Sequence, residues 1–462
     1  MQPVHTRDEL READRAAIAE VGLEALVARA GAAVARAALG ILGQGYGKRV
    51  VVVAGKGHNG DDGRVASAML ARRGVRVIEI DPGALPEALP ACDLVIDAAY
   101  GTGFKGEYRA PDVPAGTPVL AIDVPSGLDC DTGEACAGAV RATRTVTMAA
   151  LKPGLLMGEG RELAGEVKLA PIGIDVAPGD LWLVEDGDIA AWLAPRPIES
   201  NKWRSACVVL AGSPGMMGAA RFSTSGAQRA GAGMVRWCVA GATRESLPAS
   251  EAVAVAVPAT DFADAVLGEL HRCRALVIGP GIGSGPGVQS AVRDLVARAK
   301  VPVIVDADGL GALGGLEQAH EVLASRKVPA VLTPHDGEYE KLAATRAGRD
   351  SRPGADRVGA ARSLASSLGA VVLLKGSTTA VAAPGGECFL VGSGSARLAT
   401  AGTGDVLSGI VGAFLARGLD PLHAAALAAH VHGRAAGLGP AEGLVAGDLP
   451  ELVAKVLSNA RD

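Results

Sequence analysis

The chain has 462 residues, which predicts two or three domains, and its 49% hydrophobic and 21% charged residues are typical of a folded protein. A formal net charge of −5 and an aromatic share of only 3% argue against nucleic acid or an anionic membrane as a partner. Glycine is the outlier, because its 63 residues are about twice the usual share and follow no G-X-Y period, which excludes collagen. The glycines interrupt apolar runs instead, which predicts tight turns and close approaches between backbone and ligands.

Cysteine usage and the N-terminus exclude further classes of protein. The seven cysteines form no C-x-x-C pair, so neither a disulfide framework nor a structural zinc site is expected. The N-terminus lacks the apolar stretch of a secretory signal, and no apolar run approaches the ~18 residues of a membrane span. We therefore expect a cytoplasmic protein without membrane contacts, whose oligomeric state the sequence leaves open, a homo-oligomer included.

The N-terminal half alternates between helix and strand patterns. A helical pattern opens at Thr6 and Glu9, which fit a T-x-x-E capping box, and continues to about residue 42. A buried strand at 50–54 runs into the glycine-rich segment Gly55–Gly63, and a helix is predicted from Arg64 to Arg73. Further strands are predicted at 75–80, 94–97 and 118–123.

A domain boundary is predicted near the middle of the chain. The pattern weakens over 171–200, where Pro195 and Pro197 precede a polar stretch. A second alternating series follows, with strands predicted at 206–211, 275–278, 301–305, 330–332 and 371–374. Strands that alternate with helices and short loops predict an α/β fold, here two doubly wound domains at 1–195 and 196–462.

The first loop of the N-terminal half has a phosphate-binding pattern. In an open parallel sheet, ligands bind where strands end and helices begin. Gly55, Gly57 and Gly60 fit G-x-G-x-x-G at such a place, and Glu79 or Asp81 follows about twenty residues later, as in dinucleotide-binding loops. The backbone N–H groups would hold a phosphate; a plain strand-to-helix turn is the alternative.

Side-chain oxygens gather at the same edge of the predicted sheet. A turn alone does not require the side-chain oxygens of Asn59, Asp61 and Asp62, and three such oxygens would suit a cation. Asp97 and Asp123 each end a buried strand, and Ser126 follows in a turn fixed by proline. Each aspartate alone could cap a helix, but two strand-terminal aspartates favour a shared polar site.

In the C-terminal half, the segment 402–409 carries the strongest prediction of chemistry. Gly402–Gly404 precede an apolar helix and would offer N–H groups to an anion, while Asp405 in the first turn could take a proton from a hydroxyl during phosphoryl transfer. The alternative is that Asp405 is only a helix cap. No Walker A pattern is present, which disfavours a P-loop enzyme. His335 could contact a ligand or start a helix, and His430 and His432 are interpreted as structural.

Ordered motifs in each half resemble two known families. The C-terminal series resembles the ribokinase-like NAD(P)H-hydrate dehydratase family, and the N-terminal series resembles the NAD(P)H-hydrate epimerase family, whose fold is Rossmann-like. The C-terminal motifs are AGSPGMMGAA, GPGIG, DADGL, LTPHDGE, LKGSTT and AGTGDVLSGI, and the N-terminal ones are GKGHNGDDGRVA, DAAYGTGF and DVPSGLD. Together they resemble a fused bifunctional repair enzyme that epimerises the R and S hydrates of NADH and NADPH and dehydrates the S form at the expense of ADP or ATP.

The resemblance implies roles for residues that match these motifs. Asp405 and Asp123 would be catalytic. The hydrate would be bound by His58, Asn59, Gly60, Asp61, Asp62, Gly101, Thr102, Gly103, Phe104, Lys105, Gly106, Glu107, Asp123, Ala219, Gly283, His335 and Asp405. The adenine nucleotide would be bound by Lys375, Gly376, Ser377, Thr378, Thr379, Gly402, Thr403 and Gly404. Asn59, Asp97 and Ser126 would hold K⁺ in the epimerase domain, and Mg²⁺ is expected in the dehydratase domain.

One departure and several rival functions remain open at this stage. The epimerase family usually carries a glycine where Asp61 stands, and the added charge would either weaken phosphate binding or point away from it. The rivals are a ribokinase-type small-molecule kinase with a Rossmann-like N-terminal domain, a dehydrogenase and a nucleotide-sensing module. The sequence does not decide between ADP and ATP.

Overall fold

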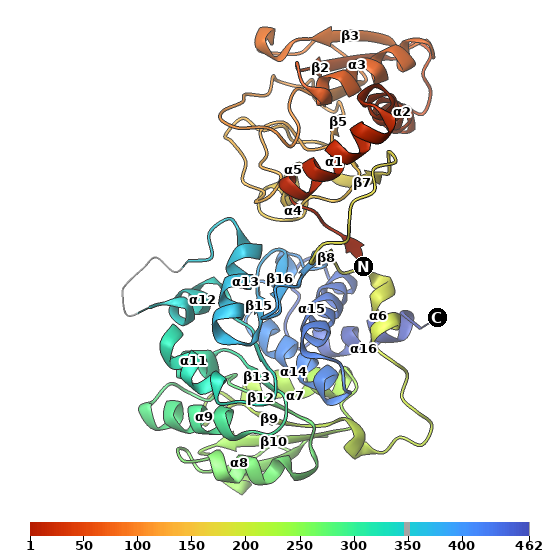
Figure 1. The fold of residues 1–462 in the computed structure, drawn as a ribbon. Helices are drawn as coiled ribbons and strands as arrows, with labels where there is room; N and C mark the ends of the chain where they lie inside the picture. The colour runs from red at the N-terminus through yellow and green to blue at the C-terminus, as the bar shows by residue number, and fades with distance from the viewer. Residues whose placement is uncertain (346–351, 462) are drawn as a thin grey trace. The chain divides into compact units, whose positions relative to one another are not determined.

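The computed structural model describes residues 1–345 and 352–461, which form two compact units (Figure 1). One unit is Gln2–Gly179, and the other runs from Asp180 to the C-terminal end and includes Met1. The predicted boundary at 195/196 therefore falls inside the second unit, which begins with strand β8 (Leu181–Leu183) and helix α6 (Asp186–Trp192). Both units are α/β and built on largely parallel sheets, as the sequence predicts.

The N-terminal unit contains a parallel sheet in the order β3-β2-β4-β5-β6-β7. The strands are β2 (Arg49–Ala54), β3 (Arg76–Ile80), β4 (Leu94–Ala98), β5 (Val119–Ile122), β6 (Arg144–Met148) and β7 (Glu166–Ala170). The apolar runs of β2, β4 and β5 are buried on both faces, which is why they read as continuous rather than alternating patterns. The chain order reverses between β2 and β4, and such a switch point is where open α/β sheets bind ligands.

The first three helices of the N-terminal unit begin and end at glycines or polar caps. Helices α1 (Arg7–Val21) and α2 (Leu23–Leu42) are separated by Gly22, whose φ of +82° is unfavourable for other residues. By length and composition α2 could span a membrane, which the sequence analysis did not anticipate. It packs against α3 (His58–Ala71) and the sheet through a face of small apolar residues, as a core helix does. Two short helices follow, α4 (Pro153–Leu156) and α5 (Gly160–Leu163).

Helix α3 begins at His58, whereas the sequence predicted its start at Arg64. The glycine at position 60 permits this, because a Cβ there would lie 1.9 Å from the carbonyl oxygen of Gly55. A Cβ on Gly55 would in turn lie 2.1 Å from the carbonyl oxygen of Ala99. Residues 58–62 are therefore the first turn of a helix held closely against the ends of β2 and β4.

The C-terminal unit contains a larger sheet, with strands in the order β8-β17-β16-β15-β14-β13-β12-β9-β10-β11. The strands from β11 to β15 are parallel, and β16 is antiparallel to both of its neighbours. Their bounds are β9 (Ala206–Leu210), β10 (Met234–Ala240), β11 (Val253–Val257), β12 (Ala275–Ile278), β13 (Val303–Val305), β14 (Ala330–Leu332), β15 (Val371–Leu374), β16 (Thr379–Ala382) and β17 (Cys388–Val391).

Helices cover both faces of this sheet (Figure 1). The main core lies under α7 (Met217–Arg229), α14 (Thr403–Ala416), α15 (Pro421–Leu438) and α16 (Leu449–Asn459). The remaining helices are α8 (Ala263–Glu269), α9 (Pro286–Arg298), α10 (Asp308–Leu313), α11 (Leu316–Ala324), α12 (Asp336–Ala343) and α13 (Arg357–Leu368). Helices α7 and α14 pack unusually closely, because a Cβ on Gly409 would lie 2.0 Å from the carbonyl oxygen of Ser223. This contact fixes the N-terminus of α14 beside the ends of the strands.

Candidate active sites

The three residues expected to hold K⁺ come together where β4 and β5 end. Asp97 is 2% exposed, and its carboxylate accepts hydrogen bonds from the Ser126 backbone N–H at 2.8 Å and the Ser126 hydroxyl at 2.6 Å. The backbone N–H of Tyr100 donates to Ser126 Oγ, and the Tyr100 carbonyl accepts from Asn59 Nδ2, both at 2.9 Å. Burial raises the pKa of Asp97 to about 6, although its hydrogen bonds with Ser126 act in the opposite direction. These neighbouring amide, carboxylate, hydroxyl and carbonyl oxygens are the donor types that suit a hard cation.

Asp123 forms a partly buried ion pair at the end of β5. Its φ of +66° lies in the left-handed region, which is rare for residues other than glycine. Its Oδ1 accepts hydrogen bonds from the Lys152 ammonium, from the Met148 backbone N–H at 3.0 Å and from the Thr147 hydroxyl at 3.3 Å. Lys152 is 2% exposed and also donates to Thr147 Oγ1 and to the Met148 carbonyl, both at 2.8 Å. Asp123 is thus held in one position by a lysine that the sequence analysis did not identify.

A second carboxyl group lies within electrostatic reach of Asp123. Burial, reinforced by Asp123, Asp61 and Asp14, raises the pKa of Asp62 to about 8. The exposed Asp14 on α1 also has a raised pKa, from desolvation and from Asp123, while Lys152 opposes the shift. At neutral pH the site therefore combines a protonated Asp62 with a lysine-paired carboxylate, a division of roles typical of acid–base chemistry.

The predicted substrate loop Gly101–Glu107 begins close to this cluster. A Cβ on Gly101 would lie 3.3 Å from the Asn59 side-chain carbon Cγ. Phe104 packs edge-on against Tyr100, with ring centroids 5.4 Å apart. The end of the loop, from Lys105 to Glu107, is exposed. The base of the loop therefore lies against the cluster of Asn59, Asp97 and Ser126, and its tip is exposed and accessible to a ligand.

Asp61, the residue that departs from the family pattern, is paired with a neighbouring arginine. Its carboxylate lies 2.9 Å from the Arg64 guanidinium, one turn later on α3. The same guanidinium donates to the Gly55 carbonyl at 3.0 Å. The negative charge that the sequence placed beside the phosphate loop is thus compensated locally.

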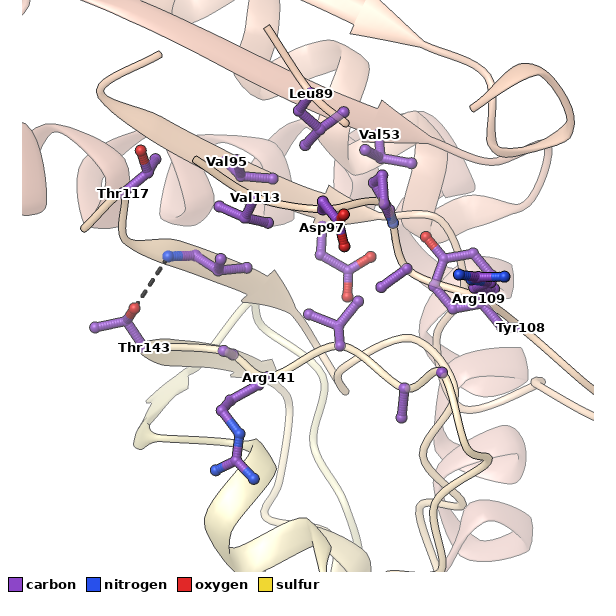
Figure 2. Close-up of a pocket in the computed structure, with 18 of the residues that line it drawn as sticks. Val53, Leu89, Val95, Asp97, Tyr108, Arg109, Val113, Thr117, Arg141 and Thr143 are labelled. Carbon is purple, nitrogen blue, oxygen red and sulfur yellow. Dashed lines mark hydrogen bonds between the residues drawn. The ribbon is translucent and has the colours of Figure 1, made fainter. Parts of the chain in front are cut away.

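A large pocket lies on the face of the N-terminal sheet opposite α2 and α3. Its volume is about 1310 Å³, and it is lined by valines of β2 and β4 together with Asp97, Tyr108, Arg109 and Arg141. Figure 2 shows Asp97 and Val53 projecting into it from neighbouring strands. The Tyr108 hydroxyl is buried and has no hydrogen-bond partner among the described residues, and burial followed by the charge of Asp97 raises its pKa. No motif marks this pocket as a whole, because Tyr108, Arg109 and Arg141 come from irregular segments and only Asp97 belongs to a motif.

The C-terminal unit gathers a separate set of charged groups around Asp306 at the end of β13. Asp306 is 1% exposed, and it accepts hydrogen bonds from Lys375 Nζ at 2.7 Å and from the Ser408 hydroxyl at 2.5 Å. A second carboxylate, that of Glu338, lies 3.8 Å from the Lys375 ammonium. Burial opposes the charge on Lys375, but Asp306 and Glu338 outweigh it and raise the pKa of this lysine.

Asp405 lies in the first turn of α14, as the sequence predicts. Gly402 adopts a φ of +92° and caps the helix, and a Cβ on Gly404 would lie 3.6 Å from Lys375 Nζ. Burial, followed by the charge of Asp306, raises the pKa of Asp405 to about 7, although Lys375 opposes the shift. The Thr403 N–H donates to the Thr400 carbonyl at 3.3 Å, so the helix N-terminus offers the later amides, those of Gly404 and Asp405, to an anion.

The other predicted hydrate contacts surround the same strand ends. The Gly283 N–H donates to Asp308 Oδ2 at 2.9 Å, and a Cβ on Gly281 would lie 2.9 Å from the Ala219 Cβ. His335 caps α12, because its Nδ1 accepts from the backbone N–H groups at 337 and 338, at 3.1 and 3.3 Å. Its side chain is 60% exposed, and its other ring nitrogen, Nε2, lies 3.5 Å from Glu338 Oε1.

The predicted nucleotide loop Lys375–Thr379 is fixed by an arginine that no motif identified. Arg357 at the start of α13 donates to the Lys375 carbonyl at 2.6 Å and pairs with Asp336 at 2.9 Å. A Cβ on Gly376 would lie 2.8 Å from the same guanidinium. Arg357 precedes Lys375 by a whole helix in the sequence, so only the folded chain reveals the contact.

Comparison with known proteins assigns the chain to a family. The model of the NAD(P)H-hydrate dehydratase family matches residues 207–459, and the model described as YjeF-related protein N-terminus matches 23–83 and 78–154. Two relatives described as bifunctional NAD(P)H-hydrate repair enzymes, from Mycobacterium leprae and Mycobacterium tuberculosis, are each 37% identical to the chain. The alignments cover 90% and 92% of this chain and 88% and 92% of the relatives.

A solved structure supports the assignment of the C-terminal half. The ADP/ATP-dependent NAD(P)H-hydrate dehydratase from Bacillus subtilis, co-crystallised with ATP and Mg²⁺, is 30% identical with a TM-score of 0.51. The match covers 60% of this chain and 98% of that one. The chain belongs to the family of bifunctional NAD(P)H-hydrate repair enzymes, with an epimerase-type N-terminal half and a dehydratase-type C-terminal half. This family membership replaces the rival interpretations as a kinase, a dehydrogenase or a sensor.

Proposed function

We propose that the C-terminal site removes water from the S hydrate of NADH or NADPH by first phosphorylating its hydroxyl. Asp405 accepts the hydroxyl proton while the hydroxyl oxygen attacks the terminal phosphorus of ADP or ATP. The bond from that phosphorus to the bridging oxygen breaks, and AMP or ADP is released. Phosphate then departs and a neighbouring ring carbon loses a proton, which restores the ring double bond. The observation that carries this proposal is Asp405, whose pKa of about 7 suits a general base and whose place beside open helix amides suits phosphoryl transfer.

The residues around Asp405 have separate tasks in this scheme. The amides of Gly404 and Asp405 hold the transferring phosphoryl group, and Lys375 adds a fixed positive charge beside it. Asp306 holds Lys375 in place, and the Ser408 hydroxyl in turn donates a hydrogen bond to Asp306. Mg²⁺ would enter with the nucleotide, where it shields the phosphate charges; no cluster of three or more His, Cys, Asp or Glu residues among the described residues forms a metal cage.

We propose that the N-terminal site interconverts the R and S hydrates. Inversion at the carbon bearing the hydroxyl is achieved if the hydroxyl takes a proton and leaves as water, and a water molecule then adds to the other face of the ring and releases a proton to the solvent. Protonated Asp62 is suited to donate the first proton, and the Lys152-paired carboxylate of Asp123 is suited to stabilise the positive ring. K⁺ among Asn59, Asp97 and Ser126 would supply a fixed positive charge near the substrate phosphates.

Incubation of the whole protein with separated R and S hydrates of NADH tests both assignments. With Mg²⁺ and either ADP or ATP, the S hydrate should return reduced-nicotinamide absorbance at once. The R hydrate should do so only after epimerisation, and without nucleotide the two hydrates should equilibrate but not dehydrate. Release of a stable phosphorylated hydrate would contradict the dehydratase assignment, and persistence of the pure R hydrate would contradict the epimerase assignment.

A further inference from the structure

Four arginines surround a small pocket in the C-terminal unit, away from the predicted catalytic residues. The pocket has a volume of about 340 Å³ and includes Arg196, Arg204, Arg274 and Arg417 in its lining. Arg274 directly precedes β12 and Arg204 lies two residues before β9, so both lie at the ends where these strands begin. The proposed phosphoryl-transfer site lies where the strands end, and Arg417 follows the last residue of α14, whose first turn contains Asp405.

Two of the four guanidinium groups are fixed in position by backbone carbonyls. Arg417 donates to the carbonyls of Ala194 at 2.8 Å and Ala230 at 3.5 Å, and Arg196 donates to the carbonyl of Gly231. A Cβ on Gly231 would lie 3.2 Å from an Arg417 nitrogen and 3.6 Å from an Arg196 nitrogen, so the two cations border the same turn. These hydrogen bonds explain the positions of Arg196 and Arg417. They do not explain why Arg204 and Arg274 line the same pocket.

No Asp or Glu is among the described residues that line the pocket. None of the four arginines forms a salt bridge with an acidic residue among residues 1–345 and 352–461. Burial, and then the charges of Arg461 and Arg196, lower the pKa of Arg417 to about 10. The cluster is a local feature, because the chain as a whole has a formal net charge of −5. A group of unpaired cations at one concave place is stabilised when an anion binds there.

We propose that this pocket binds the phosphate chain of a small polyanion, either a nucleoside diphosphate or triphosphate or a free polyphosphate. Guanidinium groups bind phosphate oxygens in a bidentate manner, and two of them, on Arg204 and Arg274, are exposed and have heads available for this purpose. The volume suits a short phosphate chain and the pocket is too small for a nucleic-acid duplex. This second site would be separate from the nucleotide site at α14.

The test measures pyrophosphate binding to the full chain by calorimetry at physiological salt. The variants are the double substitution Arg204→Gln/Arg274→Gln and, as a matched control, Lys300→Gln, an exposed cation that precedes β13 at the same end of the sheet. We expect the wild type and the control to bind one pyrophosphate that the double variant loses, or binds on the order of tenfold to a hundredfold more weakly. The dehydratase KM for ADP should stay unchanged in all three proteins.

Parallel titrations identify the source of the phosphates. If the number of ADP molecules bound per chain also falls by one in the double variant, the ligand is a nucleotide. If only pyrophosphate binding is lost, the ligand is a free polyphosphate. Identical isotherms in all three proteins would overturn the proposal, as would binding that occurs only at low salt. A loss of pyrophosphate binding matched by an equal rise in the KM for ADP would also overturn it, because the arginines would then serve the catalytic site. Binding of a single-stranded RNA oligomer but not of pyrophosphate would show a nucleic-acid surface instead.

Discussion

Each half of the molecule has a key carboxylate near the ends of parallel strands, Asp123 just after β5 and Asp405 in the first turn of α14, but the two carboxylates have different partners. In the N-terminal unit, Asp123 is bonded directly to the buried ammonium of Lys152. In the C-terminal unit, Asp405 is paired with no lysine in the described part of the chain, and the nearby Lys375 donates to Asp306 instead. A carboxylate bonded to its own cation acts as a fixed electrostatic element, whereas a desolvated one with a raised pKa can exchange protons near neutral pH.

The largest effect is expected from Asp405→Asn, which removes the proposed base without changing its size. Dehydration should slow by roughly 10²- to 10⁴-fold, the usual contribution of a positioned general base, while epimerisation continues. Dehydration is measured by the recovery of reduced-nicotinamide absorbance, and epimerisation by the ratio of R to S hydrate. A dehydration rate within a few-fold of wild type would disprove the assignment of Asp405.

The same variant carries its own folding control. The pKa of Asp405 is raised in the folded state, so ionisation of this group removes stability as pH rises toward about 7. Asp405→Asn should therefore raise the thermal midpoint relative to wild type at pH 8, and the gain should shrink at pH 5. A lower midpoint at pH 8 would indicate that lost activity reflects damaged structure.

The next effect concerns the ion pair that distinguishes the N-terminal site. Lys152→Met leaves the Asp123 carboxylate without its cation, which costs roughly 3–5 kcal/mol when a buried pair is broken on one side. We expect loss of epimerisation and a lower denaturation midpoint, with dehydration of the S hydrate retained. The double variant Lys152→Met/Asp123→Asn should recover much of the stability but not the activity, and a fully active single variant would refute the role of the pair.

The pH dependences of the two activities should run in opposite directions. Asp405 must lose its proton to act as a base, so dehydratase kcat/KM should rise with pH and level off above about 7. Asp62 must keep its proton to act as an acid, so epimerase kcat/KM should fall above about 8. Profiles measured on the same preparation provide the comparison, and parallel profiles for both activities would contradict one of the two assignments.

The sequence predicted the parts of both sites that depend on local order in the chain. Strands that end in Asp97 or run into Gly55–Gly63 are evident because apolar runs and turn residues are adjacent in the sequence. Lys152 and Arg357 were missed because their partners lie 29 and 18 residues away and the contacts depend on tertiary packing. The start of α3 was misplaced for a related reason, since only contact with Gly55 accounts for the glycine at position 60 within its first turn.

The smallest effect is expected at Asp61, where the N-terminal site departs from the family pattern. The carboxylate of Asp61 pairs with Arg64 at a largely exposed position, and such pairs contribute about 0–1 kcal/mol. Asp61→Gly should therefore leave epimerase kcat and the KM for the hydrate within about fivefold of wild type, the range that such an energy allows. Arg64→Gln provides the contrast, because it exposes the Asp61 charge to the substrate phosphates and should raise the KM without lowering kcat. A large gain in epimerase activity from Asp61→Gly would mean that Arg64 does not compensate this charge when the hydrate is bound.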